Sequence, residues 1–96
     1  MEEKKVRELL DKVMHPAINA SLLKLGIISD YKVEENGITI EMAYPFPNIP
    51  IKDMLKVSIV NALSPLGMEI KFTERVMTEE ERQRFLQIEM ENWKGL

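Results

Sequence analysis

Few side chains in this sequence belong to the types that perform chemistry in proteins. His15 is the single histidine, and the sequence contains no cysteine. The chain therefore cannot supply a disulfide, a thiolate nucleophile, or the cysteine ligands of a zinc finger or another metal centre. His15 could carry a proton or serve as one ligand of a metal shared across a dimer. Because no second histidine or cysteine can join it, we interpret His15 as an exposed or helix-capping residue.

Carboxylates and hydroxyls are the other candidates for a chemical role. The carboxylates lack the spacing of a calcium-binding loop, and most lie on the expected outer face of a hairpin. Ser21 and Ser58 have no histidine base in a triad pattern, and there is no glycine-rich phosphate loop. We therefore predict no enzyme and no cofactor, and a metal-binding or metal-transfer protein that uses His15 and carboxylates is an alternative. These carboxylates are Asp30, Glu34, Glu35, Glu41 and Asp53.

The length and charge of the chain narrow the class of protein. A chain of 96 residues suffices for one small domain, and we expect residues 1–96 to form a single one. A net charge of −3 does not favour binding to nucleic acid or to an anionic membrane. The first residues show no signal peptide, and no apolar run is long enough for a transmembrane helix. We expect a cytoplasmic protein.

An amphipathic helix is predicted at the start of the chain. Its apolar residues follow a period of about 3.6 residues, and Pro16 ends the helix at His15. A single helical turn follows over residues 21–25, and Gly26 is suited to ending it. The apolar positions of the first helix are Val6, Leu9, Leu10, Val13 and Met14.

A β-hairpin is predicted over residues 27–43. Apolar and polar residues alternate on both sides of Asn36-Gly37, a dipeptide that is typical of a type I′ turn. A two-residue turn at this place sets a register in which the apolar side chains of both strands lie on one face of the hairpin. The predicted pairs are Glu35 with Ile38, Val33 with Ile40, and Tyr31 with Met42.

A proline-rich loop from Tyr44 to Pro50 separates the hairpin from a second helix. Helical spacing of apolar residues continues from Ile51 to Leu66, and Asn48 is the expected cap. Residues 68–73 alternate as a third strand. We expect this strand to return by a right-handed crossover and to run parallel to the second strand.

A final helix is predicted from Thr78 to about residue 94, because Thr78 and Glu81 match a capping box. Its apolar face should cover the open side of the sheet or contact a second copy in a homodimer. The fold class is therefore α+β, in the order helix, strand, strand, helix, strand, helix, with a three-stranded mixed sheet and helices packed mainly on one face. The apolar face of the final helix comprises Leu86, Met90 and Trp93, with Phe85 at its edge.

The proline-rich loop is the candidate surface for a protein partner. Its prolines stiffen the backbone, so that little conformational entropy is lost when a partner binds. Large apolar side chains on such a loop are typical of interface anchors, although they could instead fold back onto the core. The candidate residues are Tyr44, Phe46, Pro47, Ile49 and Pro50.

Three stretches of the sequence together resemble one small family. They are residues 21–28, which read Ser-Leu-Leu-Lys-Leu-Gly-Ile-Ile, the hairpin with Asn36-Gly37, and Pro47-Asn48-Ile49-Pro50 before a helix. Over about residues 5–74 the chain is similar to the SufT- and PaaD-like domain of iron–sulfur cluster assembly. This domain of unknown function is also fused ahead of P-loop ATPases of the Mrp/ApbC type. Residues 77–96, which contain the final helix, lie outside the resemblance.

The chain departs from the family pattern in two stretches, and in the second of them Pro45 and Phe46 also replace the usual threonines. After the first helix the family usually has Asp-Pro-Glu, where this chain has His15-Pro16-Ala17. Before the second helix the cysteine-bearing members have Pro-x-Cys-Pro, where this chain has Ile49 in place of the cysteine. Isoleucine can neither ligate iron nor act as a nucleophile, so the role of the cysteine does not carry over. The other positions that follow the family motif are Pro16, Ser21, Leu25 and Gly26.

The resemblance implies an accessory or adaptor protein of iron–sulfur cluster assembly that acts through protein–protein contacts. Its expected partner is an assembly scaffold or an Mrp/ApbC-like P-loop ATPase. A small dimeric interaction module unrelated to cluster assembly is a further alternative.

Overall fold

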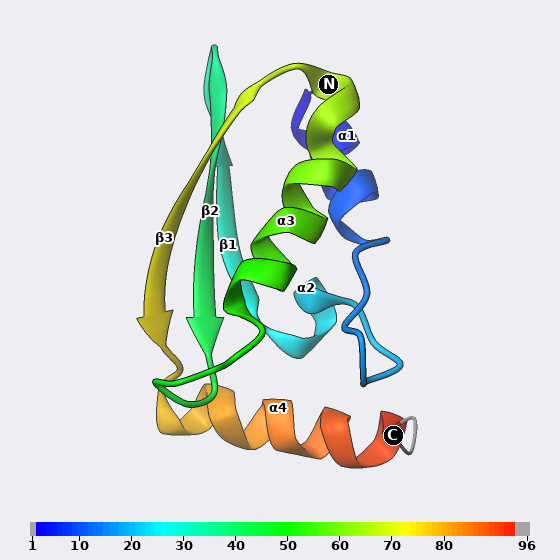
Figure 1. The fold of residues 1–96 in the computed structure, drawn as a ribbon, viewed down its shortest axis with the longest axis vertical. Helices are drawn as coiled ribbons and strands as arrows, with labels where there is room; N and C mark the ends of the chain where they lie inside the picture. The colour runs from blue at the N-terminus through cyan, green and yellow to red at the C-terminus, as the bar shows by residue number, and fades with distance from the viewer. Residues whose placement is uncertain (1, 94–96) are drawn as a thin grey trace.

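A three-stranded mixed sheet lies at the centre of the fold. The structure is a computed structural model that describes residues 2–93, and the strands follow the order β1-β2-β3 (Figure 1). The pair β1–β2 is antiparallel and the pair β2–β3 is parallel, which confirms the predicted direction of the third strand and the α+β class. The elements are α1 (Glu2–Leu10), α2 (Leu22–Leu25), β1 (Ile28–Val33), β2 (Gly37–Tyr44), α3 (Lys52–Leu63), the 3-10 helix η1 (Ser64–Leu66), β3 (Glu69–Val76) and α4 (Glu79–Asn92).

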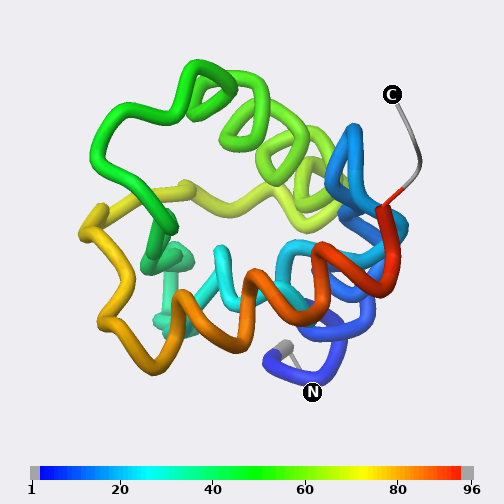
Figure 2. The backbone as a smooth tube through the Cα atoms, turned by 90° about the horizontal axis from the view of Figure 1, so that it is seen from below, coloured from blue at the N-terminus to red at the C-terminus, as the bar shows by residue number. Residues whose placement is uncertain are grey.

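The helices lie mainly on one side of this sheet, as predicted. Helices α1 and α3 stand beside each other against it, and α4 runs across its end (Figure 1). Figure 2, seen from that end, shows α4 extending from the end of β3 toward the segment between α1 and α2. There the N–H of Asn19 donates to the carbonyl of Asn92 at 2.9 Å. No helix within residues 2–93 is long and apolar enough to cross a membrane.

Alternation along the central strand builds the core. Ile38, Ile40 and Met42 of β2 are at most 1% exposed. Between them, residues such as Thr39 point to the opposite side of the sheet, where Lys71 of β3 is exposed. One face of the sheet is thus apolar and covered, and the other is polar and open. The helices contribute Val6, Leu10, Leu22, Leu25, Leu55, Ile59 and Leu63 to the core.

The hairpin has the predicted apolar face but a different register. Val33 pairs with Ile38 and Tyr31 with Ile40, so the predicted pairs are wrong by two residues. Because side chains alternate with a period of two, a shift of two leaves the same residues on the core face. An irregularity at Ser29 then interrupts the ladder, between the pairs that β1 makes at residues 28 and 30.

The turn of the hairpin is longer than predicted. Within residues 2–93, neither Asn36 nor Gly37 adopts a positive φ, so the turn is not of type I′. Instead the N–H of Glu34 donates to the carbonyl of Gly37 at 2.8 Å. Gly37 is already part of β2, where it pairs with Glu69 of β3. Glycine at position 37 is therefore required by the pairing of β2 with β3 and not by the conformation of the turn.

The first helix is shorter than predicted and does not reach Met14. The next backbone groups bond across a small loop instead. The N–H of Leu22 donates to the carbonyl of Val13 at 2.9 Å, and the N–H of His15 donates to that of Ala20 at 3.0 Å. These bonds replace helical ones, and Met14 is consequently exposed.

The cap predicted for the second helix is also wrong. Helix α3 begins at Lys52, and Ile51 occupies the cap position without a side-chain hydrogen bond. Asn48 lies too far ahead in the proline-rich loop to reach the first free N–H groups of the helix. Met54, one of the apolar residues in helical spacing between Ile51 and Leu66, is exposed.

Helix α4 has the predicted cap but does not cover the open side of the sheet, while contact of its apolar face with a second copy stays a prediction. Thr78 and Glu81 bond reciprocally, which confirms the capping box. Phe85 is 5% exposed, whereas Met90 is 73% exposed and Trp93 is also largely exposed. Because the open face of the sheet is polar, it offers no apolar surface to this helix, which packs across the end of the fold through Phe85. The predicted end at residue 94 lies outside the described residues.

Candidate functional site

A small apolar pocket lies between the proline-rich loop, the start of α3 and helix α4. Its volume is about 220 Å³. His15 and Ile49, which mark the two departures from the family pattern, both line it although they are far apart in the sequence. We call this cavity the apolar pocket. Its lining residues are His15, Ile27, Tyr44, Pro45, Phe46, Ile49, Pro50, Ile51, Leu55, Phe85 and Glu89.

Tyr44 forms a wall of the apolar pocket at the end of β2. It is 2% exposed, so the exposed position predicted for it is wrong, because β2 continues through this residue. Its hydroxyl donates to the carboxylate of Glu74 at 2.8 Å. Burial, and then Glu74, raise the pKa of the Tyr44 phenol, so the ring stays neutral. Lys56, 3.0 Å from the same carboxylate, and the Tyr44 hydroxyl hold the pKa of Glu74 below its usual value.

The rest of the proline-rich loop reaches the surface. Phe46 is 47% exposed, Pro47 and Pro50 are exposed, and Ile49 is half-buried against the core. The guanidinium of Arg82 on α4 lies 6.0 Å from the centroid of the Phe46 ring. Apart from the buried tyrosine, the candidate partner-binding residues are thus accessible from solvent. That they bind a partner stays a prediction.

His15 is held by its own loop and does not cap α1, which ends before it. Its Nδ1 accepts a hydrogen bond from the N–H of Ala17 at 3.0 Å. The side chain is half-buried and lines the apolar pocket, while the neighbouring Pro16 is exposed. The interpretation of His15 as a helix cap is therefore wrong.

The remaining motif positions build α2. The Oγ of Ser21 accepts a hydrogen bond from the N–H of Lys24 at 3.0 Å, which caps this single turn as predicted. Leu25 is buried in the core, and Gly26 ends the turn with a φ of 82°, a conformation that favours glycine. These residues are structural and do not line the apolar pocket.

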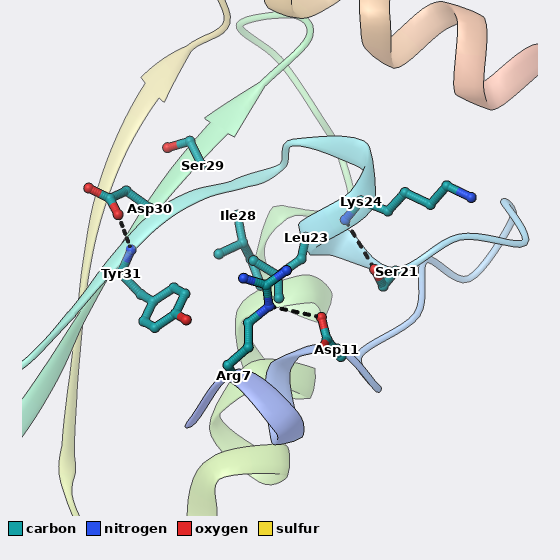
Figure 3. Close-up of a pocket in the computed structure, with 9 residues that line it drawn as sticks. All are labelled: Arg7, Asp11, Ser21, Leu23, Lys24, Ile28, Ser29, Asp30 and Tyr31. Carbon is teal, nitrogen blue, oxygen red and sulfur yellow. Dashed lines mark hydrogen bonds and ion pairs between the residues drawn. The ribbon is translucent and has the colours of Figure 1, made fainter. Parts of the chain in front are cut away.

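A second pocket, larger and more polar, lies between α1, α2 and β1 (Figure 3). Its volume is about 510 Å³. The Nε of Arg7 lies 3.2 Å from the Asp11 carboxylate, and Asp30 accepts from the N–H of Tyr31 at 2.8 Å. Its lining holds two cations, Arg7 and Lys24, and two carboxylates, Asp11 and Asp30, so no ligand charge is favoured. We therefore take the apolar pocket as the candidate functional site.

An ionic cluster fastens α4 to the sheet and so positions one wall of the apolar pocket. The guanidinium of Arg75 on β3 donates to both carboxylate oxygens of Glu81 at 2.7 and 2.8 Å. Its Nε donates to Glu41 of β2 at 2.8 Å. The bidentate bond from Arg75, together with the N–H of Thr78, lowers the pKa of Glu81 from 4.5 to about 2.

This cluster predicts a specific loss of stability in acid. The pKa of Glu81 is lower in the folded chain than in the unfolded chain. The contribution of the Glu81 carboxylate to the free energy of unfolding is therefore complete above pH 4.5 and is lost as the pH falls through 2. We expect Glu81→Gln to lower the free energy of unfolding by roughly 1 kcal/mol at pH 7, since the pair is partly screened by solvent. Measured by urea unfolding, the difference in free energy from wild type should shrink between pH 4.5 and 2.

The matched control for Glu81→Gln is Glu80→Gln, whose exposed carboxylate lies 3.9 Å from Arg84. A difference at Glu81 that stays constant with pH would contradict this prediction.

Comparison with known proteins identifies the family. Residues 3–71 match the family described as iron–sulfur cluster assembly protein. The chain belongs to this family. The crystal structure of the domain of unknown function DUF59 from Bacillus anthracis has the same fold, with a TM-score of 0.70, 20% sequence identity, and coverage of 88% of this chain and 89% of that chain. No curated protein matches the chain. The predicted family and a general role in iron–sulfur cluster assembly are therefore confirmed.

The described residues of this iron–sulfur cluster assembly protein do not form a ligand set for a cluster. It has no cysteine, and isoleucine stands at the family's cysteine position. Within residues 2–93, no three histidine, aspartate or glutamate side chains lie together as a metal site would require. His15 and Glu89 both line the apolar pocket, but two donors fall short of a typical metal site. None of the carboxylates considered from the sequence lines this pocket.

Sequence reasoning missed the α4 side of the site. Phe85 was expected only at the edge of an apolar face, and Glu89 was not considered. The packing of α4 depends on which face of the sheet is already covered, and this is a property of the whole fold. The capping box was the one local signal that this helix begins close to the end of the sheet.

Proposed function

We propose that this iron–sulfur cluster assembly protein is an adaptor. In this proposal it binds a protein partner in the cytoplasm through the apolar pocket and the proline-rich loop, and performs no cluster chemistry itself. The partner is an assembly scaffold or an Mrp/ApbC-like P-loop ATPase, the type to which domains of this kind are fused.

The observation that carries the proposal is that residues from both altered stretches of the family pattern line one pocket. His15 and Ile49 line it together, and isoleucine has no atom that can bind iron or sulfur. What this pocket offers instead is apolar surface beside an exposed aromatic ring, that of Phe46. Such a surface is suited to holding an anchor side chain from another protein.

The backbone around the pocket supports a binding role. Prolines restrict the loop on both sides of Phe46 and again at Pro50. The carbonyl of Tyr44, just before the loop, accepts a hydrogen bond from the N–H of Met77 at 2.7 Å. A loop held in this way loses little entropy on binding, so more of the contact energy appears as affinity.

The proposal is tested with purified proteins. The full chain is immobilised, and binding of an assembly scaffold and of an Mrp-like ATPase from the same organism is measured by biolayer interferometry. We expect one of them to bind, and Phe46→Ala and Ile49→Ala each to weaken binding by about fivefold or more, as for interface anchors. Thr73→Ala, on the open face of the sheet, is the control that should bind as wild type does. If neither protein binds the wild-type chain, the adaptor proposal is wrong.

A further inference from the structure

The ammonium group of Lys52 lies over an aromatic wall of the apolar pocket. The Nζ of Lys52 lies 4.9 Å from the centroid of the Tyr44 ring, which lines the pocket. Within residues 2–93, no carboxylate forms an ion pair with Lys52. Lys52 contributes by charge to the lowered pKa of Glu74, after Lys56 and the Tyr44 hydroxyl, which are the groups that bind this carboxylate directly. Lys52 is thus an available cation on an aromatic wall.

The other two charged side chains close to the pocket, Arg82 and Glu89, belong to α4. Arg82 lies over the Phe46 ring, but its guanidinium is paired with Glu79. Glu89 of α4 lines the pocket and, among the described residues, forms no ion pair. Lys52, at the start of α3, therefore attracts a carboxylate, whereas Glu89, on α4, repels one.

The size of the pocket limits what can enter it. Sites for small molecules and cofactors have volumes of roughly 300–1,000 Å³, whereas the apolar pocket has about 220 Å³. Its walls are mainly aliphatic and aromatic, with Leu55 and Phe85 buried at its inner side. This volume and lining suit one large apolar side chain, as in the pockets that receive interface anchors.

We propose that the apolar pocket receives a single large apolar side chain from a partner protein, with an aspartate or glutamate next to it that binds Lys52. The inference rests on the proposed adaptor function and specifies the chemistry of its partner. Glu89 sets the direction of the bound segment, because the acidic residue is excluded from the α4 side.

The test uses a random peptide library displayed on phage and selected on the full chain. We expect the selected peptides to share one large apolar residue with an acidic residue beside it. A synthetic peptide of the selected sequence is then titrated by fluorescence anisotropy against wild type, Lys52→Glu and Lys71→Glu. Binding should weaken about tenfold or more in Lys52→Glu, by analogy with truncated charge pairs at interfaces. Lys71→Glu makes the same change of charge on the open face of the sheet and should bind as wild type does.

Three results would overturn this inference: no selected peptide, selected peptides without the acidic residue, or equal binding to wild type and Lys52→Glu. Thermal unfolding of Lys52→Glu shows whether the variant is folded, and Lys52→Gln provides a milder second variant with the same expected direction. The inference and the adaptor function can fail separately. A scaffold or ATPase that binds equally to wild type and Lys52→Glu supports the adaptor and contradicts the inference. If the selected peptides bind wild type more tightly than Lys52→Glu but no assembly protein binds the chain, the inference is supported and the adaptor function is contradicted.

Discussion

Replacement of Phe85 by alanine is expected to lower the free energy of unfolding by about 3–5 kcal/mol, the usual loss for a buried phenylalanine. Phe85 is the buried residue of α4 and joins this helix to the core at the apolar pocket. The native stability of a small domain is only about 5–15 kcal/mol, so this loss is a large part of the total. Urea unfolding followed by circular dichroism measures it.

The matched control for Phe85→Ala lies on the same helix. Met90 is 73% exposed, so Met90→Ala should change the free energy of unfolding by less than about 0.5 kcal/mol. Hydrogen exchange adds a local measure, since the amides of α4 should lose protection before those of β2 when the helix is no longer anchored. Equal losses for the two variants would show that α4 is not held through Phe85.

The sheet and its covered face were predictable because they depend on local alternation. The residues at 38, 40 and 42 repeat with a period of two, and all three are buried in β2. The capping box of α4 was predictable for the same reason, since it involves only Thr78 and the three residues that follow. The packing of α4 was not, because Met90 and Trp93 have an apolar pattern that no surface of the fold covers.

The candidate site was predictable only in part. The proline-rich loop could be recognised by its composition, and the family resemblance marked His15 and Ile49. Their meeting in one pocket requires the loop before α2 and the loop before α3 to lie at the same end of the sheet, which only the tertiary structure shows. The role of Lys52 likewise depends on the position of its Nζ over the Tyr44 ring.

Asn36-Gly37 shows how a local signal can be misread. The dipeptide is typical of a type I′ turn, in which both residues need a positive φ. Neither residue has a positive φ here, and Gly37 instead lies in a close contact between two strands. A Cβ on Gly37 would lie 3.0 Å from the carbonyl oxygen of Glu69, closer than ordinary van der Waals contact. The missing side chain allows β3 to approach β2 at the start of the parallel ladder.

The two interpretations of this glycine predict a loss of stability for Gly37→Val but different results for Asn36→Ala. With the observed register, Gly37→Val forces a branched side chain against a backbone carbonyl and should lower the free energy of unfolding by about 1–3 kcal/mol. Asn36→Ala should change it by less than about 0.5 kcal/mol, because Asn36 is exposed and adopts no left-handed conformation. In a type I′ turn the asparagine would matter as well, since alanine is strained at positive φ. Urea unfolding of both variants decides between the registers, and a large loss at Asn36 would restore the two-residue turn.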